Sequence, residues 1–255
     1  MIWPSLLQQT VLRYPYPLLF ATISGAHLYG FPSADSDFDL RGVHILPTEE
    51  VIGLETPRET IELSTIEDGI ELDLVTHDIK KFFLFLLKKN GYVLEQLYSP
   101  LIIQTSAEHK ELKTIAKGCI TRHHCHHYLG FSSAQWRLFL KECPPRLKPL
   151  LYVYRTLLTG IHLMQTGEIE ANLVKLNESF KLSYINDLIS YKLSESEHYE
   201  LGNVDIEFHE REFIRLRELL EVAAQKSSLV EEPTAKLALN DLLKRLRVNK
   251  LHGVY

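Results

Sequence analysis

A buried-strand pattern that runs into a small-residue turn and then a pair of acids most constrains the fold of this chain. The apolar residues 18–23 lead into Ser24-Gly25-Ala26, and a dozen residues later the sequence reads Asp37-Phe38-Asp39-Leu40. Successive side chains of a strand point to opposite faces. Asp37 and Asp39 are therefore expected on one face, with Phe38 and Leu40 pointing into a core.

A later segment supplies a third acid in a similar setting. Residues 70–75, Ile-Glu-Leu-Asp-Leu-Val, alternate apolar and acidic side chains, as a strand with one polar face does. A strand pairing beside residues 37–44 would bring Asp73 across from Asp37 and Asp39. We prefer Asp73 to Glu71 because the shorter side chain holds a metal ion more rigidly.

This arrangement predicts a site for a nucleoside triphosphate and divalent metal ions. Carboxylates are hard oxygen ligands for Mg²⁺ or Mn²⁺, and the backbone N–H groups of a turn before a helix can hold a phosphate. Two metal ions can activate an attacking hydroxyl and neutralise a leaving pyrophosphate. Either motif alone is commonly a solvent-exposed strand face or an ordinary turn. Their order and spacing, with the third acid, favour the functional interpretation.

The composition is that of a globular protein, with 45% hydrophobic and 24% charged residues. No apolar run approaches a bilayer span and no secretory signal is visible, so we expect no membrane association. Three cysteines, an odd number, argue against a disulfide framework and favour the cytoplasm. Residues 1–105 hold 7 Lys and Arg against 14 Asp and Glu, and the remainder holds 21 against 19. An RNA partner is allowed by these charges but not required.

The periodicity predicts an α+β protein with two domains. A small mixed β-sheet flanked by helices is expected over residues 1–105, the catalytic domain, and an all-helical domain over residues 106–255. We expect strands at 17–23, 37–46, 58–65 and 69–76, the last two forming a hairpin at Glu67-Asp68-Gly69. The expected helices span 4–14, 77–89, 92–98, 106–118, 122–141, 145–166, 172–192, 206–226 and 233–248.

Three further features carry candidate functional side chains. Lys148, Tyr152 and Arg155 form one stripe of the helix at 145–166 and are nucleotide-binding candidates, with a solvated helix face as the equal alternative. Arg41 shares the face of the acid pair and would bind phosphate or buffer the carboxylates. The histidines of 123–127 include two at the i, i+4 spacing of a metal pair, but no matched second pair is present, so a zinc site is disfavoured.

Several of these motifs together resemble the nucleotidyltransferase superfamily that includes DNA polymerase β. The segment from Ser24 to Gly42 is similar to the bacterial and phage nucleotidyltransferases associated with RNA-repair operons. Three later stretches extend the likeness: Leu72–Asp78, Asn90–Leu97 and His127–Ser132. The resemblance implies that Asp37, Asp39 and Asp73 are the catalytic metal ligands. It also implies that Ser24, Gly25 and Ala26 form the triphosphate-side turn, with Ala26 in place of the usual Ser or Gly.

The sequence therefore predicts a metal-dependent enzyme that moves an NMP from an NTP to an acceptor hydroxyl. An RNA end is the favoured acceptor, and a protein or small-molecule hydroxyl stays open. A non-catalytic nucleotide-binding or partner-binding module is the alternative from another class, although the intact acid trio argues against it. The oligomeric state and the preferred base are not predicted.

Overall fold

Five strands form one mixed sheet in the order β3-β4-β2-β1-β5. The computed structural model describes residues 4–55, 57–67, 69–194 and 205–248. The strands are β1 (Leu18–Ile23), β2 (Phe38–His44), β3 (Thr60–Glu67), β4 (Ile70–Asp78) and β5 (Ile102–Gln104). The β2–β4 pair is parallel and the other neighbours are antiparallel. The expected α+β class is confirmed, and the short β5 was not expected from the sequence. Asp68 of the expected hairpin turn lies outside the described residues.

Chain contacts divide the molecule into two compact units. The first comprises residues 1–25, 37–119 and 232–255, and the second comprises 26–36 and 120–231. The segment 26–36, from the first half of the chain, therefore belongs to the second unit, and residues 232–255, from the second half, belong to the first unit. The expected boundary between two folding domains, after residue 105, stays a prediction.

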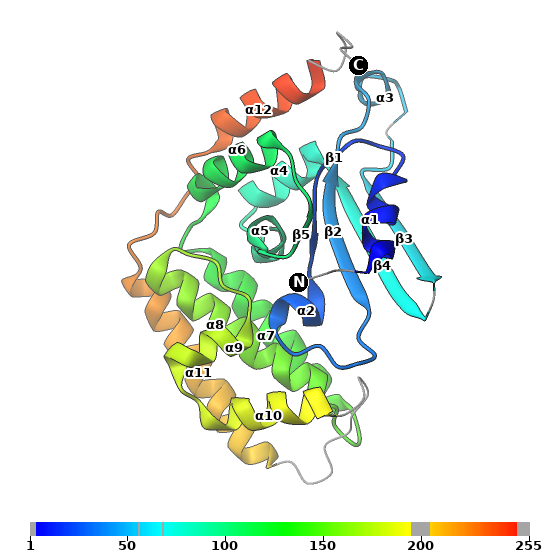
Figure 1. Ribbon diagram of the computed structural model, residues 1–255. Coiled ribbons are helices and arrows are strands. Elements are labelled where there is room, and N and C mark those ends of the chain that lie inside the picture. The colour runs from blue at the N-terminus through cyan, green and yellow to red at the C-terminus, as the bar shows by residue number, and fades with distance from the viewer. Residues whose placement is uncertain (1–3, 56, 68, 195–204, 249–255) are drawn as a thin grey trace. The chain divides into compact units, whose positions relative to one another are not determined.

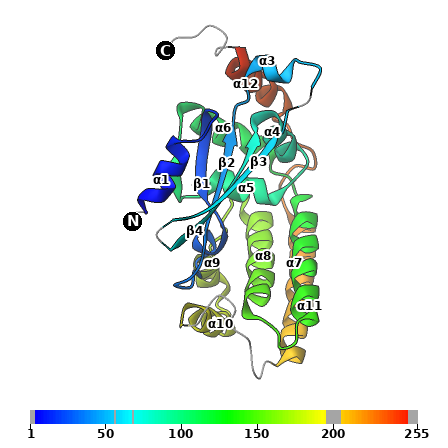
Figure 2. The same ribbon diagram turned by 90° about the vertical axis from the view of Figure 1, so that its right-hand side faces the viewer.

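Helices cover both faces of the sheet in the first unit (Figures 1 and 2). On one face α1 (Ser5–Leu12) buries Leu6 and Leu7 against apolar side chains such as Leu40 and Leu74. This confirms the expected inward direction of Leu40. On the other face Phe20 contacts the rings of Phe82 and His109. The helices on this second face are α4 (Ile79–Leu87), α5 (Gly91–Tyr98) and α6 (Ala107–Ala116).

The last described helix, α12 (Lys236–Val248), packs on α4 and α6 in the same unit. Its Arg247 donates to both oxygens of Asp78, from Nη2 at 2.7 and 2.6 Å. Asp78 also caps α4 by accepting from the Lys80 N–H at 2.9 Å. Asp78 is only 1% exposed and Arg247 only 8%. A buried ion pair therefore fastens the C-terminal helix to the end of β4.

Arg247→Met is expected to lower the free energy of unfolding by about 3 kcal/mol, because it leaves the buried Asp78 carboxylate without its cation. Urea unfolding followed by circular dichroism measures this loss. Arg245→Met on the same helix is the matched control, since Arg245 pairs with Glu111 and Asp241 at the surface. It should leave stability nearly unchanged. Equal effects of the two substitutions would contradict a structural role for the buried pair.

The second unit is helical apart from its connections (Figure 1). Its long helices are α7 (His124–Lys141), α8 (Leu147–Thr166) and α11 (Ile206–Lys226), with α9 (Leu173–Phe180) and α10 (Ser183–Ser194) between them. The single helix expected at 172–192 is thus two helices. Lys181 adopts a left-handed backbone, with φ +55°, and the Asn177 amide bonds both the N–H and the carbonyl of Leu182. An asparagine side chain thereby replaces the helical hydrogen bonds at the break.

The segment 26–36, which joins the glycine turn to the first acid, packs within this helical unit. Arg155 of α8 lies over the Tyr29 ring, 4.0 Å from its centroid. Asn172 donates to the Leu28 carbonyl at 3.3 Å, and the buried Lys192 of α10 donates to the Ser33 hydroxyl at 2.8 Å. The helices α8 and α10 and the residue that caps α9 therefore each fix one point of the segment. The remaining short helices of the chain are α2 (Gly25–Tyr29) and α3 (Thr48–Val51).

In the described parts of the chain, no helix is both long enough and apolar enough to cross a membrane. The three cysteines are free thiols, of which Cys119 and Cys125 are buried and Cys143 is exposed. Burial raises the pKa of the Cys119 thiol to about 12.

Candidate active site

Two of the three expected acids lie directly opposite each other on neighbouring strands. The parallel register of β2 and β4 pairs Asp39 with Asp73. Leu40, Leu72 and Leu74 are fully buried on the α1 side of these strands. Because side chains alternate, the two acids lie on the opposite face of the sheet. Their side chains are 21% and 35% exposed, so both carboxylates are accessible to a small ion.

The glycine turn lies against one of these acids. The N–H of Ser24 donates to the Asp39 carbonyl at 2.8 Å. Gly25 has φ +58°, and a Cβ built on it would lie 1.8 Å from Asp39 Oδ2. The carboxylate therefore occupies the space that any other residue at position 25 would fill. Both the backbone angle and this close approach require glycine.

Arg41 lies between the two carboxylates. Its Nη2 is 2.5 Å from Asp39 Oδ1 and 3.3 Å from Asp73 Oδ2, so one nitrogen is shared by both acids. Burial lowers the pKa of Arg41, but Tyr92, Asp39 and Asp73 outweigh burial and hold the pKa above its ordinary value. The repulsion expected of crowded acids is therefore offset by a cation of the same strand.

Further contacts fix the Arg41 guanidinium in place. Nη1 donates to the carbonyls of Leu40 and Asp73, each at 2.8 Å, and Nε donates to the Tyr92 hydroxyl at 2.9 Å. Tyr92 lies at the start of α5, which Asn90 caps by accepting from the Tyr92 N–H at 3.0 Å. All three guanidinium nitrogens are thus engaged by protein groups.

The third expected acid is less closely tied to the pair. Asp37 is half-buried and immediately precedes β2. Among the described residues no hydrogen bond or ion pair joins Asp37 to Asp39 or Asp73. No group of three or more His, Cys, Asp or Glu side chains in the described ranges forms a ready metal-ligand set. The rejected alternative on β4, Glu71, is exposed.

The donor chemistry of the pair nevertheless fits a divalent cation. Asp39 and Asp73 present carboxylate oxygens from adjacent strands, and these are ligands that Mg²⁺ and Mn²⁺ prefer. Ser64 of β3 donates to Asp73 Oδ1 at 2.9 Å and orients that carboxylate. Carboxylates that bind metal ions are commonly held in orientation by a hydrogen bond of this kind.

The candidates on α8 lie in the second compact unit. Arg155 is 3% exposed and lies among the rings of Tyr29, Tyr152 and Phe131. Tyr152 contacts Tyr29 edge-on, and Lys148 is half-buried. This stripe is therefore not a solvated helix face. Its role in nucleotide binding stays a prediction.

The histidine-rich run lies at the start of α7. His124 is fully buried and its ring bonds to Thr121. Burial, with Arg155 nearby, lowers the pKa of His127 to about 4, so this ring is neutral near pH 7. His123 and His126 stack on each other with ring centroids 5.8 Å apart.

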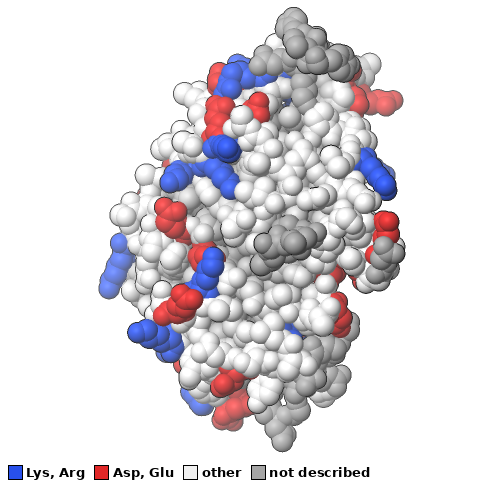
Figure 3. All heavy atoms as spheres, in the orientation of Figure 1, with Lys and Arg blue, Asp and Glu red and all other residues white. Residues whose placement is uncertain are grey.

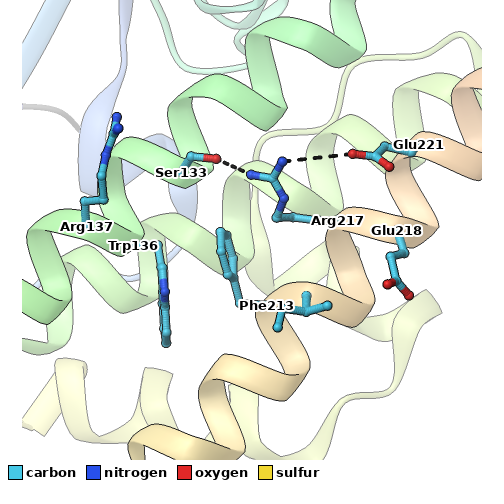
Figure 4. A pocket seen from close by; sticks show the side chains of 8 residues that line it. Ser133, Trp136, Arg137, Phe213, Arg217, Glu218 and Glu221 are labelled. Carbon is cyan, nitrogen blue, oxygen red and sulfur yellow. Dashed lines mark hydrogen bonds and ion pairs between the residues drawn. The ribbon is translucent and has the colours of Figure 1, made fainter.

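A pocket of about 430 Å³ lies between α7 and α11, and its lining side chains are drawn in Figure 4. Trp136 and Phe213 stack at 4.9 Å, and Arg217 donates to the Ser133 hydroxyl. Arg217 also pairs with Glu221 at 4.0 Å. The lining carries two arginines and two glutamates, so its charge is balanced and does not favour a polyanion.

Sequence reasoning missed Tyr92 and Ser64 as site residues. Tyr92 belongs to the Asn90–Leu97 stretch that carried the family resemblance. A tyrosine hydroxyl directly after the Asn90-Gly91 helix start could have identified it as a site residue. Ser64 had no comparable signal, because its contact with Asp73 depends on the hairpin register of β3 and β4.

Known proteins and one family model match most of this chain. A family model for the RNA repair pathway DNA polymerase β family matches residues 5–245. A Methanocaldococcus jannaschii protein, MJ0002, named only as uncharacterized, is 32% identical over 241 residues, which cover 89% of this chain and 94% of that protein. Bacillus subtilis YcgL, also named as uncharacterized, is 27% identical over 160 residues, which cover 61% of this chain and 60% of that protein.

The chain is also similar to a protein of known structure. A nucleotidyltransferase-like protein from Exiguobacterium sibiricum 255-15 aligns with 96% of this chain and 78% of its own, at 11% identity and a TM-score of 0.32.

Proposed function

Because this chain belongs to the RNA repair pathway DNA polymerase β family, within the nucleotidyltransferase superfamily, we propose that it transfers an NMP unit from an NTP to an acceptor hydroxyl. The observation that carries the proposal is the pairing of Asp39 with Asp73 beside the Gly25 turn. The acceptor hydroxyl gives up its proton to solvent and its oxygen bonds to the α-phosphorus. The bond from that phosphorus to the oxygen bridging the α- and β-phosphates breaks, and pyrophosphate leaves with the bridging oxygen.

Asp37, Asp39 and Asp73 would hold Mg²⁺ or Mn²⁺, which supplies charge neutralisation and a lower pKa for the attacking hydroxyl. The Gly25 turn keeps the backbone close to the Asp39 carboxylate, where its N–H groups can bind a phosphate. Ser64 orients Asp73 through a hydrogen bond of 2.9 Å. These residues together position the triphosphate and hold the cation ligands in register.

We favour an RNA end as the acceptor, in keeping with the family. On the face seen in Figure 3, outside the grey atoms, acidic and basic groups are interspersed, so that face offers no broad positive area. Titrating labelled RNA at several salt concentrations tests this acceptor, because contacts to several phosphates make the affinity fall steeply with salt. Absence of measurable RNA binding would contradict an RNA acceptor and favour a small one.

The transfer itself is tested with NTPs labelled at different phosphorus atoms. With Mg²⁺ or Mn²⁺ and a mixture of RNA and cell lysate, α-labelled NTP is expected to label an acceptor, whereas γ-labelled NTP should release its label as pyrophosphate. Separation of the products by size shows whether RNA, protein or a small molecule is the acceptor. Transfer of the γ-label would contradict nucleotidyl transfer and indicate phosphoryl transfer.

One observation favours a second candidate, a non-catalytic nucleotide-binding or partner-binding module. Arg41 pairs with two of the expected metal ligands, as in a site whose acids serve only structure. Such a module would bind NTP without transferring label and would show no requirement for Asp39.

A further inference from the structure

We propose that Arg41 is a built-in counter-cation that occupies the acid pair in the metal-free protein and yields those oxygens to an incoming divalent ion. This inference rests on the proposed function, because it takes Asp39 and Asp73 as the metal ligands. Arg41 is then a positioning residue of the site rather than a direct ligand of the triphosphate.

The first step of the argument is the overlap of partners. Arg41 Nη2 contacts Asp39 Oδ1 and Asp73 Oδ2, the carboxylate oxygens that face each other across the strand pair. A guanidinium N–H and a metal ion cannot use the same oxygen lone pair. Arg41 carries a permanent positive charge, so it also repels a second cation placed between these acids.

The second step is that Arg41 has anchors other than the two carboxylates. Nη1 bonds to the Leu40 and Asp73 carbonyls, and Nε bonds to the Tyr92 hydroxyl. These three bonds use neither carboxylate. Because the guanidinium is planar and rigid, these bonds also fix the position of Nη2. The two carboxylates are therefore the groups that turn toward an incoming ion, while Arg41 stays beside the site.

The third step weighs competition against preorganisation. Removing Arg41 would also loosen Asp39 and Asp73, which would weaken metal binding. However, Ser64 still orients Asp73, and the Gly25 turn still lies against Asp39. Removing the competing positive charge should therefore strengthen metal binding more than the looser carboxylates weaken it.

The test measures Mn²⁺ binding by the paramagnetic resonance signal of the free ion, with no enzymatic turnover. Arg41→Met is expected to bind Mn²⁺ roughly tenfold more tightly than wild type, a value well below the unscreened Coulomb estimate because both carboxylates are partly exposed. Arg41→Lys keeps the charge and should bind Mn²⁺ much as wild type does. Arg245→Met is the matched control, because Arg245 also bridges two carboxylates, Glu111 and Asp241, that are not site residues.

A second readout is thermal unfolding in chelator and in saturating Mn²⁺. In chelator, Arg41→Met should unfold at a lower temperature than wild type, because its acids repel each other, and Mn²⁺ should raise its midpoint by more than it raises that of wild type. If Arg41→Met does not fold, Tyr92→Phe removes one of the bonds that hold the guanidinium between the acids. A less firmly held cation competes less with the metal ion, so Mn²⁺ binding is expected to tighten roughly threefold.

The outcomes separate this inference from the proposed function. Suppose that wild type binds Mn²⁺, that Asp39→Asn abolishes this binding, and that Arg41→Met binds Mn²⁺ no more tightly than wild type. That combination would overturn the counter-cation role alone. Mn²⁺ binding that Asp39→Asn leaves intact, in both the wild-type and Arg41→Met backgrounds, would overturn the metal site and with it the proposed function.

Discussion

Asp39→Asn is expected to reduce NMP transfer by at least about 1000-fold while leaving the protein folded. Asn preserves the shape of the side chain but removes its charge. Asp39 is the point at which the elements of the site meet, because it contacts the Gly25 turn, pairs with Arg41 and lies opposite Asp73. Initial rates with α-labelled NTP measure the loss, and circular dichroism verifies the fold.

Glu71→Gln is the matched control for this substitution. Glu71 lies on β4 two residues from Asp73, but its side chain is exposed. Removing that charge should leave the transfer rate within about twofold of wild type, since substitution of an exposed surface side chain usually has little effect. A rate for Asp39→Asn above a tenth of that of wild type would contradict the assignment of Asp39 as a ligand.

The strand pattern could be predicted because its cause is local. Alternation along 37–40 and 70–75 places the polar side chains on one face, and the structure pairs β2 with β4 so that Asp39 lies opposite Asp73. A strand with one buried face also has a strongly specified register, since a slip of one residue would turn Leu72 and Leu74 toward the polar side. The facing positions of Asp39 and Asp73 therefore follow from residue spacing once β2 and β4 are neighbours, whereas the sheet order, with its short β5, was not predicted.

Contacts between segments distant in the sequence could not be predicted in this way. The segment 26–36 contacts Arg155, Asn172 and Lys192, which are more than a hundred residues away, and nothing in its own sequence marks those partners. The division of the helix expected at 172–192 depends on the Asn177 amide, whose capping role appears only when Leu182 folds back on it. Periodicity identifies a buried face, but it does not identify what lies against that face.

The position of Arg41 shows the same limit within the site. Alternation placed its side chain on the acid face, and both a phosphate-binding role and a buffering role were consistent with that. The anchoring by Tyr92 and by the Asp73 carbonyl depends on the placement of α5 and on the β2–β4 register together. Such a bridging position is a property of three elements and has no signature in any one of them.

Gly25→Ala is expected to reduce NMP transfer at least about 100-fold, and to weaken Mn²⁺ binding, through a single added methyl group. The new Cβ would lie 1.8 Å from Asp39 Oδ2, so either the turn or the carboxylate must move. Any movement separates the phosphate-binding backbone from the acid beside it. Alanine also has to adopt φ +58°, which costs about 1 kcal/mol by itself.

Gly69→Ala separates these two effects. Gly69, in the β3–β4 turn, has φ +76°, but nothing lies within 4 Å of a Cβ built on it. Both alanine variants should therefore lose a similar amount of stability from backbone strain, whereas only Gly25→Ala should lose transfer and Mn²⁺ binding. Suppose that Gly25→Ala kept full activity and lost only as much stability as Gly69→Ala. The backbone strain common to both variants would then explain the result, and the contact between the turn and Asp39 would have no part in catalysis.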